Sequence, residues 1–183
     1  PVVYELTQLD LLSDMKDRII IDWGKGAINW CQNGTTAKEL LEIRPVVSEI
    51  DFRSYDKVLL SYETLHKIVY NKAAYKEWED KLSAVAGVYL ITDTKNGKLY
   101  VGSATAQYGM LLQRWTNYVV NGHGGNVELK RIVDTKGFDY VKKNFQYSVL
   151  ENYNAKMDDH YILRREAWWK GTLCTRQYGY NKN

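Results

Sequence analysis

The sequence predicts an α+β fold, in which a small antiparallel three-stranded sheet is flanked by helices over residues 84–183. Three observations predict it. Two short apolar runs flank a Lys-Asn-Gly turn at residues 95–97, residues 107–121 have helical spacing, and residues 145–151 alternate between polar and apolar side chains. Residues 1–83 precede this core as a mixed β/α element.

The N-terminal element begins with patterns typical of strands. A strand is predicted at residues 2–6, and a hairpin follows whose strands, 18–23 and 27–31, flank a Gly-Lys-Gly turn. Helical spacing then predicts helices at residues 62–70 and 73–85. This part carries no functional motif, so a role in specificity, in protein contacts or as a scaffold stays open.

The C-terminal segment has a regular order of elements. The turn at residues 95–97 joins predicted strands at residues 88–92 and 99–103 into a hairpin. The predicted elements that follow are a helix at residues 107–121, a helix from an Asn126 cap to about residue 135, a strand at 145–151 and a helix at 158–173. The predicted order is therefore β-β-α-α-β-α.

The net charge is distributed unevenly along the chain. Residues 1–83 carry 11 Lys and Arg against 14 Asp and Glu, whereas residues 84–183 carry 14 against 8 and have a net charge of +6. A positive half of this size attracts a polyanion, although a similar surplus is common on ordinary solvated surfaces. Charge therefore permits a nucleic-acid partner without demanding one.

Membrane and disulfide classes are not expected. Apolar runs such as residues 18–22 and 87–91 are far shorter than the ~20 residues of a membrane span, and no signal peptide is recognisable. A cytoplasmic protein without membrane contact is the expectation. Cys31 and Cys174 lack the spacing of a zinc site or a disulfide scaffold, so reduced thiols are expected.

The predicted hairpin carries two short triplets. Gly-Val-Tyr stands at residues 87–89 and Tyr-Val-Gly at residues 100–102, with ten residues between them. The pair resembles the two-part signature of the GIY-YIG nucleases. In that family a helix after the hairpin carries a catalytic Arg, a later helix carries a metal-binding Glu, and an Asn lies near the end. Arg114, Glu166 and Asn181 resemble these residues in order and approximate spacing, so the resemblance covers the chain from the first triplet to Asn181.

Glu166 has the least ordinary position in the sequence. The apolar residues within roughly 60° on either side of it on a helical wheel are Ile162, Leu163, Trp169 and Leu173. An ionised carboxylate in an apolar stripe is costly unless it is paired or coordinates a metal. Two kinds of partner stay open: a metal ion, as the resemblance implies, or an ion pair with Arg114 or Lys170.

Arg114 and Glu166 fit the chemistry of phosphodiester hydrolysis. Mg²⁺ takes only one or two protein carboxylates together with waters and phosphate oxygens, so one Glu suffices for Mg²⁺ or Mn²⁺. The Arg114 guanidinium stays protonated and is able to hold the scissile phosphate bidentately. On its helix, Arg114 shares a polar edge with Tyr118 and Asn121, and this edge is expected to face a cleft.

A general base is the missing part of the predicted site. The resemblance implies a Tyr phenol in this role, for which Tyr100 is the first candidate and Tyr89 the second. The reference pKa of ~10 for Tyr is a poor match to neutral pH. It has to be lowered by Arg114, by Lys98 or by a metal-bound phosphate.

Three further positions complete the comparison with the family. Where the family often has a His one turn after the catalytic Arg, this chain has Tyr118, as in the nuclease domain of the excision-repair incision protein. His123 lies in a Gly-rich loop, which either brings an imidazole near a phosphate or forms a helix C-cap followed by the N-cap Asn126. Asn181 is expected to brace the active site, as the closing Asn of the family does. His160 has no motif around it.

The sequence therefore predicts a metal-dependent endonuclease that hydrolyses DNA phosphodiester bonds with a Tyr, Arg and Glu site. The expected catalytic set is Tyr89, Tyr100, Arg114, Tyr118, Glu166 and Asn181, with substrate contacts from Lys98, Arg114 and His123. DNA is the expected partner, and RNA stays open. The alternative function is a catalytically inactive nucleic-acid-binding module on the same fold.

Overall fold

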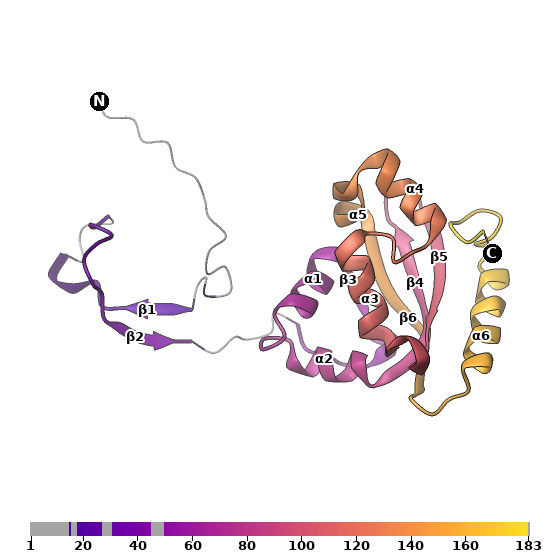
Figure 1. The fold of residues 1–183 in the computed structure, drawn as a ribbon, viewed down its shortest axis with the longest axis horizontal. Coiled ribbons are helices and arrows are strands. Elements are labelled where there is room, and N and C mark those ends of the chain that lie inside the picture. Colours follow the sequence, from indigo (N-terminus) through magenta and orange to yellow (C-terminus); the bar gives the residue numbers. More distant parts are fainter. Residues whose placement is uncertain (1–14, 16–17, 27–30, 45–49, 183) are drawn as a thin grey trace. The chain divides into compact units, whose positions relative to one another are not determined.

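The computed structural model describes residues 15, 18–26, 31–44 and 50–182, and it divides the chain into two compact units, residues 1–47 and 48–183. Figure 1 shows the strands and helices of both units. No helix within these described ranges is long and apolar enough to cross a membrane. The predicted division at residue 84 differs from this boundary, because residues 50–83 pack as part of the second unit.

Two strands form the sheet of the first unit. β1 (Ile19–Ile21) pairs antiparallel with β2 (Leu40–Ile43), so that Ile19 lies opposite Ile43. The partner of β1 among the described residues is thus a later segment than the one that the sequence predicts. Residues 27–30 and the predicted strand at 2–6 lie outside the described residues.

The second unit is built on a four-stranded antiparallel sheet in the order β3-β6-β4-β5. The strands are β3 (Leu59–Ser61), β4 (Val85–Asp93), β5 (Lys98–Ala104) and β6 (Phe145–Asn154). The three predicted strands are confirmed as β4, β5 and β6, and the α+β class is confirmed with them. β3 is an addition: it is a three-residue edge strand that pairs with β6. β5 forms the opposite edge of the sheet.

The register of the β4–β5 hairpin sorts the side chains between two faces. Tyr89 lies opposite Gly102 and Ile91 opposite Tyr100, whereas Val88 lies opposite Ser103. Because side chains alternate along a strand, both tyrosines point to one face and Ser103 points to the other.

Three helices cover the tyrosine face. α1 (Tyr62–Tyr70) has the bounds that the sequence predicts, and α2 (Lys76–Ser83) is shorter than predicted. α3 (Met110–Asn121) begins after a short 3-10 turn and packs on β4 and β5. The Tyr62 hydroxyl donates to the Val119 carbonyl at 2.8 Å, which ties α1 to α3. Residues before 84 are thus part of the core.

The remaining helices follow the hairpin and α3. α4 (Val127–Lys136) begins at Asn126, whose side chain accepts from the Leu129 amide at 3.0 Å, so the predicted cap is confirmed. α5 (Phe138–Asn144) is an additional short helix. α6 (Asp159–Thr172) packs on β4 and β5 from the face opposite α3 (Figure 1). There Ala86, Val88, Val101 and Ile162 form a buried apolar cluster.

Candidate active site

A pocket of about 430 Å³ lies at the end of β5, on the free edge of the sheet. Its lining includes Ser103 near the end of β5 and Thr105 just after it, Arg114 and Asn117 from α3, and Asp159, His160 and Leu163 from α6. The pocket is therefore lined both by α3, which covers the tyrosine face, and by α6, which covers the opposite face. We call it the β5-edge pocket.

Arg114 reaches this pocket in a fixed orientation. Its Nε donates to the Tyr89 hydroxyl at 3.1 Å, and one terminal nitrogen donates to the Gly124 carbonyl at 3.0 Å. The guanidinium carbon also lies 5.4 Å from the centre of the Tyr118 ring. No carboxylate pairs with Arg114 among the described residues. Its positive charge is consequently available to an anion in the pocket.

The tyrosines form a buried cluster behind Arg114. The Tyr89 and Tyr118 hydroxyls share a hydrogen bond of 2.8 Å, and both rings contact Tyr100 edge to face or tilted. Burial, with a smaller effect of neighbouring tyrosines, raises the pKa of Tyr89 and of Tyr118 above the ordinary value of 10. Both phenols are therefore neutral at physiological pH, and neither lines the β5-edge pocket.

The triplet glycine Gly102 is explained by this cluster. A Cβ atom at Gly102 would overlap the Tyr89 phenol, which packs directly over the glycine across the strand pair. The loop glycine Gly124 has φ +51°, and a Cβ there would overlap the Tyr118 ring. Both glycines let the backbone approach the two phenols that surround Arg114.

Glu166 is largely buried, with 14% of its side chain exposed, and it has two partners. The Lys170 ammonium lies 2.6 Å from one carboxylate oxygen, and the Ser103 hydroxyl donates to the other. Of the two pairing residues that the sequence left open, Lys170 is the one found. Because Ser103 also lines the β5-edge pocket, the carboxylate is joined to that pocket by one hydroxyl group.

The prediction that Leu163 belongs to the apolar stripe around Glu166 is wrong. Leu163 is 49% exposed and lines the open β5-edge pocket, because α6 meets the sheet through the side that carries Ile162. Trp169 and Leu173 pack against the buried cluster as predicted. The stripe is therefore narrower than the wheel indicated, and Glu166 lies at its edge.

Asn181 braces the free edge of β5. Its side-chain nitrogen donates to the Val101 carbonyl and its oxygen accepts from the Val101 amide, both at 2.8 Å. Tyr180 extends the contact by donating its backbone amide to the Leu99 carbonyl at 2.9 Å. The fully buried Asn181 thus satisfies backbone groups that an edge strand leaves unpaired.

The tail is anchored by Asp93, a residue that sequence reasoning missed. Asp93 is fully buried at the end of β4 and accepts from the Tyr180 hydroxyl at 2.7 Å and from the Tyr140 hydroxyl. The anchor holds the residue next to Asn181 in place. An acidic residue directly after the predicted apolar strand at residues 88–92 was the available signal.

Two predicted substrate contacts lie away from this pocket. Lys98 stands at the turn end of β5 beside the Tyr180 ring, about five strand residues or roughly 17 Å from Ser103. The His123 ring nitrogen Nδ1 accepts from the Gly125 amide at 3.0 Å. Gly122, with φ +77°, forms the C-cap of α3. The loop therefore has the capping structure that the sequence allowed, and its Gly124 carbonyl holds Arg114.

Thr105 is a second residue that the sequence did not single out. Its hydroxyl is buried, lines the β5-edge pocket and has no hydrogen-bond partner in the described part of the chain. A buried hydroxyl without a partner is costly, so a ligand oxygen or a water is needed there. The only sequence signal was its position two residues after Ser103.

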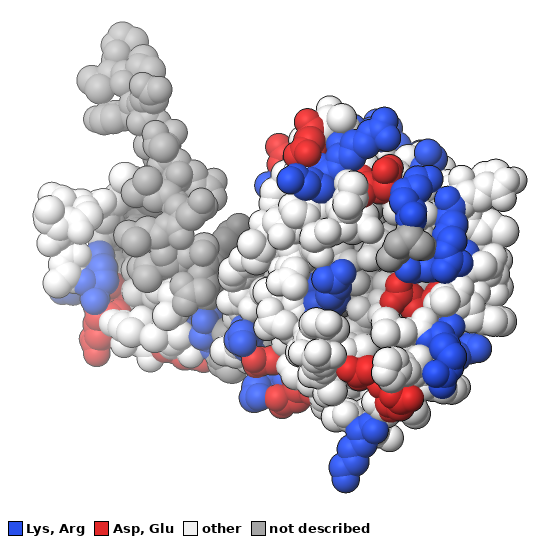
Figure 2. All heavy atoms as spheres, turned by 45° about the vertical axis from the view of Figure 1, so that its right-hand side comes forward, with Lys and Arg blue, Asp and Glu red and all other residues white. Residues whose placement is uncertain are grey.

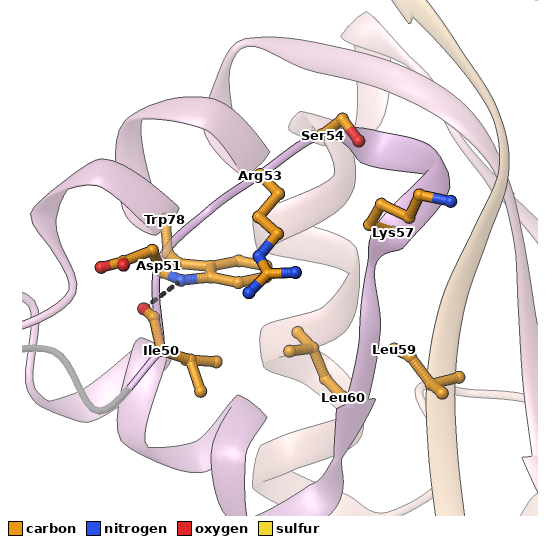
Figure 3. Close-up of a pocket in the computed structure, with 8 residues that line it drawn as sticks. All are labelled: Ile50, Asp51, Arg53, Ser54, Lys57, Leu59, Leu60 and Trp78. Carbon is orange, nitrogen blue, oxygen red and sulfur yellow. Dashed lines mark hydrogen bonds between the residues drawn. The ribbon is translucent and has the colours of Figure 1, made fainter.

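A second, larger pocket of about 540 Å³ lies where the second unit begins. Figure 3 shows Trp78 and Ile50 on one side of it and Leu59 and Leu60 on the other, with Arg53 reaching between them. The Trp78 indole nitrogen donates to the Ile50 carbonyl at 3.0 Å. None of the predicted site residues lines this pocket, so the β5-edge pocket is the candidate active site.

Two solved structures are similar to this chain. The catalytic domain of the homing endonuclease I-TevI is 29% identical with a TM-score of 0.40, over 52% of this chain and 96% of that one. A mutant of the catalytic domain of the intron endonuclease I-TevI is 26% identical with a TM-score of 0.41, over 54% and 94%. No family model and no curated protein matches the chain. Residues 87–181 resemble a GIY-YIG nuclease domain in their triplets and in the order of their site residues.

Proposed function

We propose that this chain is a metal-dependent endonuclease that hydrolyses DNA phosphodiester bonds in the β5-edge pocket. The observation that carries the proposal is that Arg114 and the hydroxyl partner of Glu166, Ser103, line the same pocket. Arg114 lines the pocket without a carboxylate partner, and the largely buried Glu166 accepts a hydrogen bond from the Ser103 hydroxyl. A scissile phosphate requires a cation beside it, and a hard metal ion requires a carboxylate.

Arg114 is proposed to hold the scissile phosphate. Tyr89 and Gly124 already engage two of its nitrogens, which fixes the plane of the guanidinium before any ligand binds. The other terminal nitrogen is left to donate to a phosphate oxygen. Because the orientation is preset, no reorganisation is needed as negative charge develops on the phosphate.

Glu166 is proposed to hold Mg²⁺ or Mn²⁺. A carboxylate has about four acceptor positions, and Lys170 and Ser103 use one each, so a position for an ion remains. Such an ion, when bound, neutralises phosphate charge and stabilises the leaving oxygen. The Thr105 hydroxyl, which has no described partner, is a further donor or acceptor for water or phosphate oxygens. Because Lys170 competes for the carboxylate, we expect weak metal affinity.

Tyr100 is proposed as the general base in preference to Tyr89. The Tyr89 hydroxyl is occupied by Tyr118 and Arg114, and its pKa is raised by burial. The hydroxyl of Tyr100 makes no hydrogen bond to a described residue, although the ring does not line the β5-edge pocket. We expect Tyr100→Phe to stop cleavage without weakening DNA binding, and we expect Tyr89→Phe to change the orientation of Arg114 instead.

A nucleic-acid-binding module without turnover is the second candidate function. The Glu166–Lys170 pair favours it, because an ammonium at 2.6 Å meets the electrostatic demand of the carboxylate without any metal. Both functions share the basic surface. Figure 2 shows Lys and Arg side chains, with a smaller number of Asp and Glu among them, over the upper part of the second unit, where α4 and α5 lie in Figure 1. The two functions differ in whether a phosphodiester bond is broken.

Conversion of supercoiled plasmid separates the two functions. An enzyme is expected to nick or linearise the plasmid with Mg²⁺ or Mn²⁺. Chelator should stop this cleavage, and the Glu166→Ala variant should not cleave. Glu63→Ala removes a carboxylate from the exposed surface of α1 and should leave cleavage unchanged. Binding of the same plasmid in chelator with no cleavage under any metal would favour the inactive module, and a matched RNA reports the substrate class.

A further inference from the structure

The outer face of α6 carries two exposed aromatic rings. Tyr161 and Trp168 are 39% and 50% exposed, and they lie seven residues apart. Seven residues are two helical turns, so the rings share one face and stand roughly 10 Å apart along the helix. Exposed aromatic rings in register on one helix face are a surface for stacking.

The Trp168 ring packs against Arg165, which is itself held by Glu151. The Arg165 guanidinium carbon lies 4.4 Å from the centre of the Trp168 ring, and its Nε donates to both Glu151 oxygens at 3.0 Å. Hydrogen bonding from Arg165 lowers the pKa of Glu151 to about 2, so the pair stays charged at neutral pH. A carboxylate and a guanidinium thus fix one face of the indole while half of its surface remains open.

Tyr161 has a similar support two turns earlier. The Arg164 guanidinium carbon lies 5.7 Å from the centre of the Tyr161 ring. The Tyr153 ring contacts the Tyr161 ring edge to face, with 5.7 Å between their centres. Arg164 pairs with no carboxylate among the described residues. A positive charge that is not neutralised therefore lies beside the exposed phenol.

Tyr161 and Trp168 lie on α6, the helix that also lines one side of the β5-edge pocket. His160 and Leu163, which flank Tyr161 in the sequence, line that pocket. Around the helix, at 100° per residue, Arg164 lies about 40° beyond the pocket-lining His160, and Trp168 and Tyr161 lie about 40° and 60° beyond Arg164. A strand that leaves the pocket across α6 would therefore meet Arg164 before either ring. The spacing of roughly 10 Å matches about three nucleotide steps of 3.4 Å.

We propose that Tyr161, Arg164 and Trp168 bind an unpaired nucleic-acid strand, with bases stacked on the two rings and a phosphate at Arg164. The bases of a duplex are already stacked on both sides, so aromatic platforms select single strands. Arg164, whose charge no described carboxylate neutralises, adds attraction for the negative backbone, whereas the charge of Arg165 is balanced by Glu151. This inference rests on the proposed nuclease function in one respect: the substrate of that nuclease would be DNA with an unpaired strand next to the cleavage site.

Fluorescence anisotropy of labelled oligothymidine, measured in chelator, tests this surface without any cleavage. We expect Trp168→Ala and Tyr161→Ala each to weaken binding about tenfold or more, since each removes one stacking platform. Trp168→Phe should retain most of the affinity because it keeps an aromatic face. Tyr70→Ala removes a ring on α1 that is more exposed than either, at 61%, and should have no effect.

The result for strand binding is independent of the result for nuclease activity. If the chain binds oligothymidine through Trp168 but cuts no plasmid, the surface stands and the nuclease fails. If Trp168→Ala binds as tightly as the wild type, or if a blunt duplex is bound as tightly as the single strand, the surface is overturned whatever the plasmid shows. Oligouridine in place of oligothymidine reports whether the strand is DNA or RNA. Circular dichroism of each variant establishes that the fold is retained.

Discussion

The two faces of the β4–β5 hairpin bury polar groups in opposite ways. The α3 face buries neutral phenols, and burial raises the pKa of Tyr89 and Tyr118. The α6 face buries a charged pair, Glu166 with Lys170. The faces meet at the β5-edge pocket, to which one contributes Arg114 and the other a Ser103-linked carboxylate. In the proposed function, the neutral face orients the guanidinium of Arg114 and the charged face provides the carboxylate that would hold a metal ion.

Arg114→Gln tests the α3 face and should have the largest effect. Loss of the preset guanidinium should lower the plasmid cleavage rate by about 10²- to 10³-fold, the usual cost of removing one charge-stabilising donor. Initial rates at saturating plasmid measure it. Arg53→Gln, which removes an exposed guanidinium before β3, is the matched control, and equal rates for the two variants would remove Arg114 from the mechanism.

Lys170→Met tests the charged face. Leaving Glu166 buried without its ammonium should lower the free energy of unfolding by about 3–5 kcal/mol. Urea unfolding followed by Trp fluorescence measures this cost. If Glu166 is a metal ligand, Mg²⁺ should restore part of the lost stability, since a ligand that binds only the folded state stabilises it. Lys156→Met on the exposed surface is the control. A large loss that Mg²⁺ does not restore would leave the ion pair as the sole role of Glu166.

Asn181→Ala tests the brace on the edge that both faces share. The change leaves the Val101 amide and carbonyl without partners and should cost about 1–3 kcal/mol in the free energy of unfolding. Urea unfolding measures the cost, and Asn152→Ala at an exposed position of β6 should stay within about 0.5 kcal/mol of the wild type. Equal stabilities of the two variants would contradict the brace.

The smallest effect is expected from acid, through the pair between Glu151 of β6 and Arg165 of α6. The folded pKa of Glu151 is lowered to about 2 from its ordinary 4.5, first by hydrogen bonding from Arg165. Its contribution to stability is therefore complete above 4.5 and is lost as the pH falls from there towards 2. Urea midpoints across this range should converge for the wild type and Glu151→Gln at the acid end. Parallel curves would show that Glu151 does not carry the effect.

Local patterns predicted much of the second unit. Turn residues 95–97 and the short apolar runs beside them located the β4–β5 hairpin, alternation over residues 145–151 located β6, and Asn126 marked the start of α4. β3 was missed because three residues are too short for an alternating pattern. α5 was missed because it has only seven residues and follows a glycine, Gly137. The unit boundary was misplaced because the pairing of β3 with β6 is a long-range contact.

The candidate site was predicted in its residues more than in its arrangement. The wheel identified Glu166 as a carboxylate in need of a partner, and Lys170, one turn on, was among the partners considered. It could not show that Ser103 joins Glu166 to the pocket, because that contact spans 63 residues. The displacement of Lys98 from the pocket likewise depends on which end of β5 meets α3 and α6.

The most direct test of the central claim is a calorimetric titration of Mg²⁺ and of Mn²⁺ into the wild type and Glu166→Gln. We predict weak, saturable binding to the wild type that is lost in the variant, while circular dichroism shows an intact fold. Metal binding of equal affinity in both proteins would contradict the assignment of Glu166 as the metal ligand.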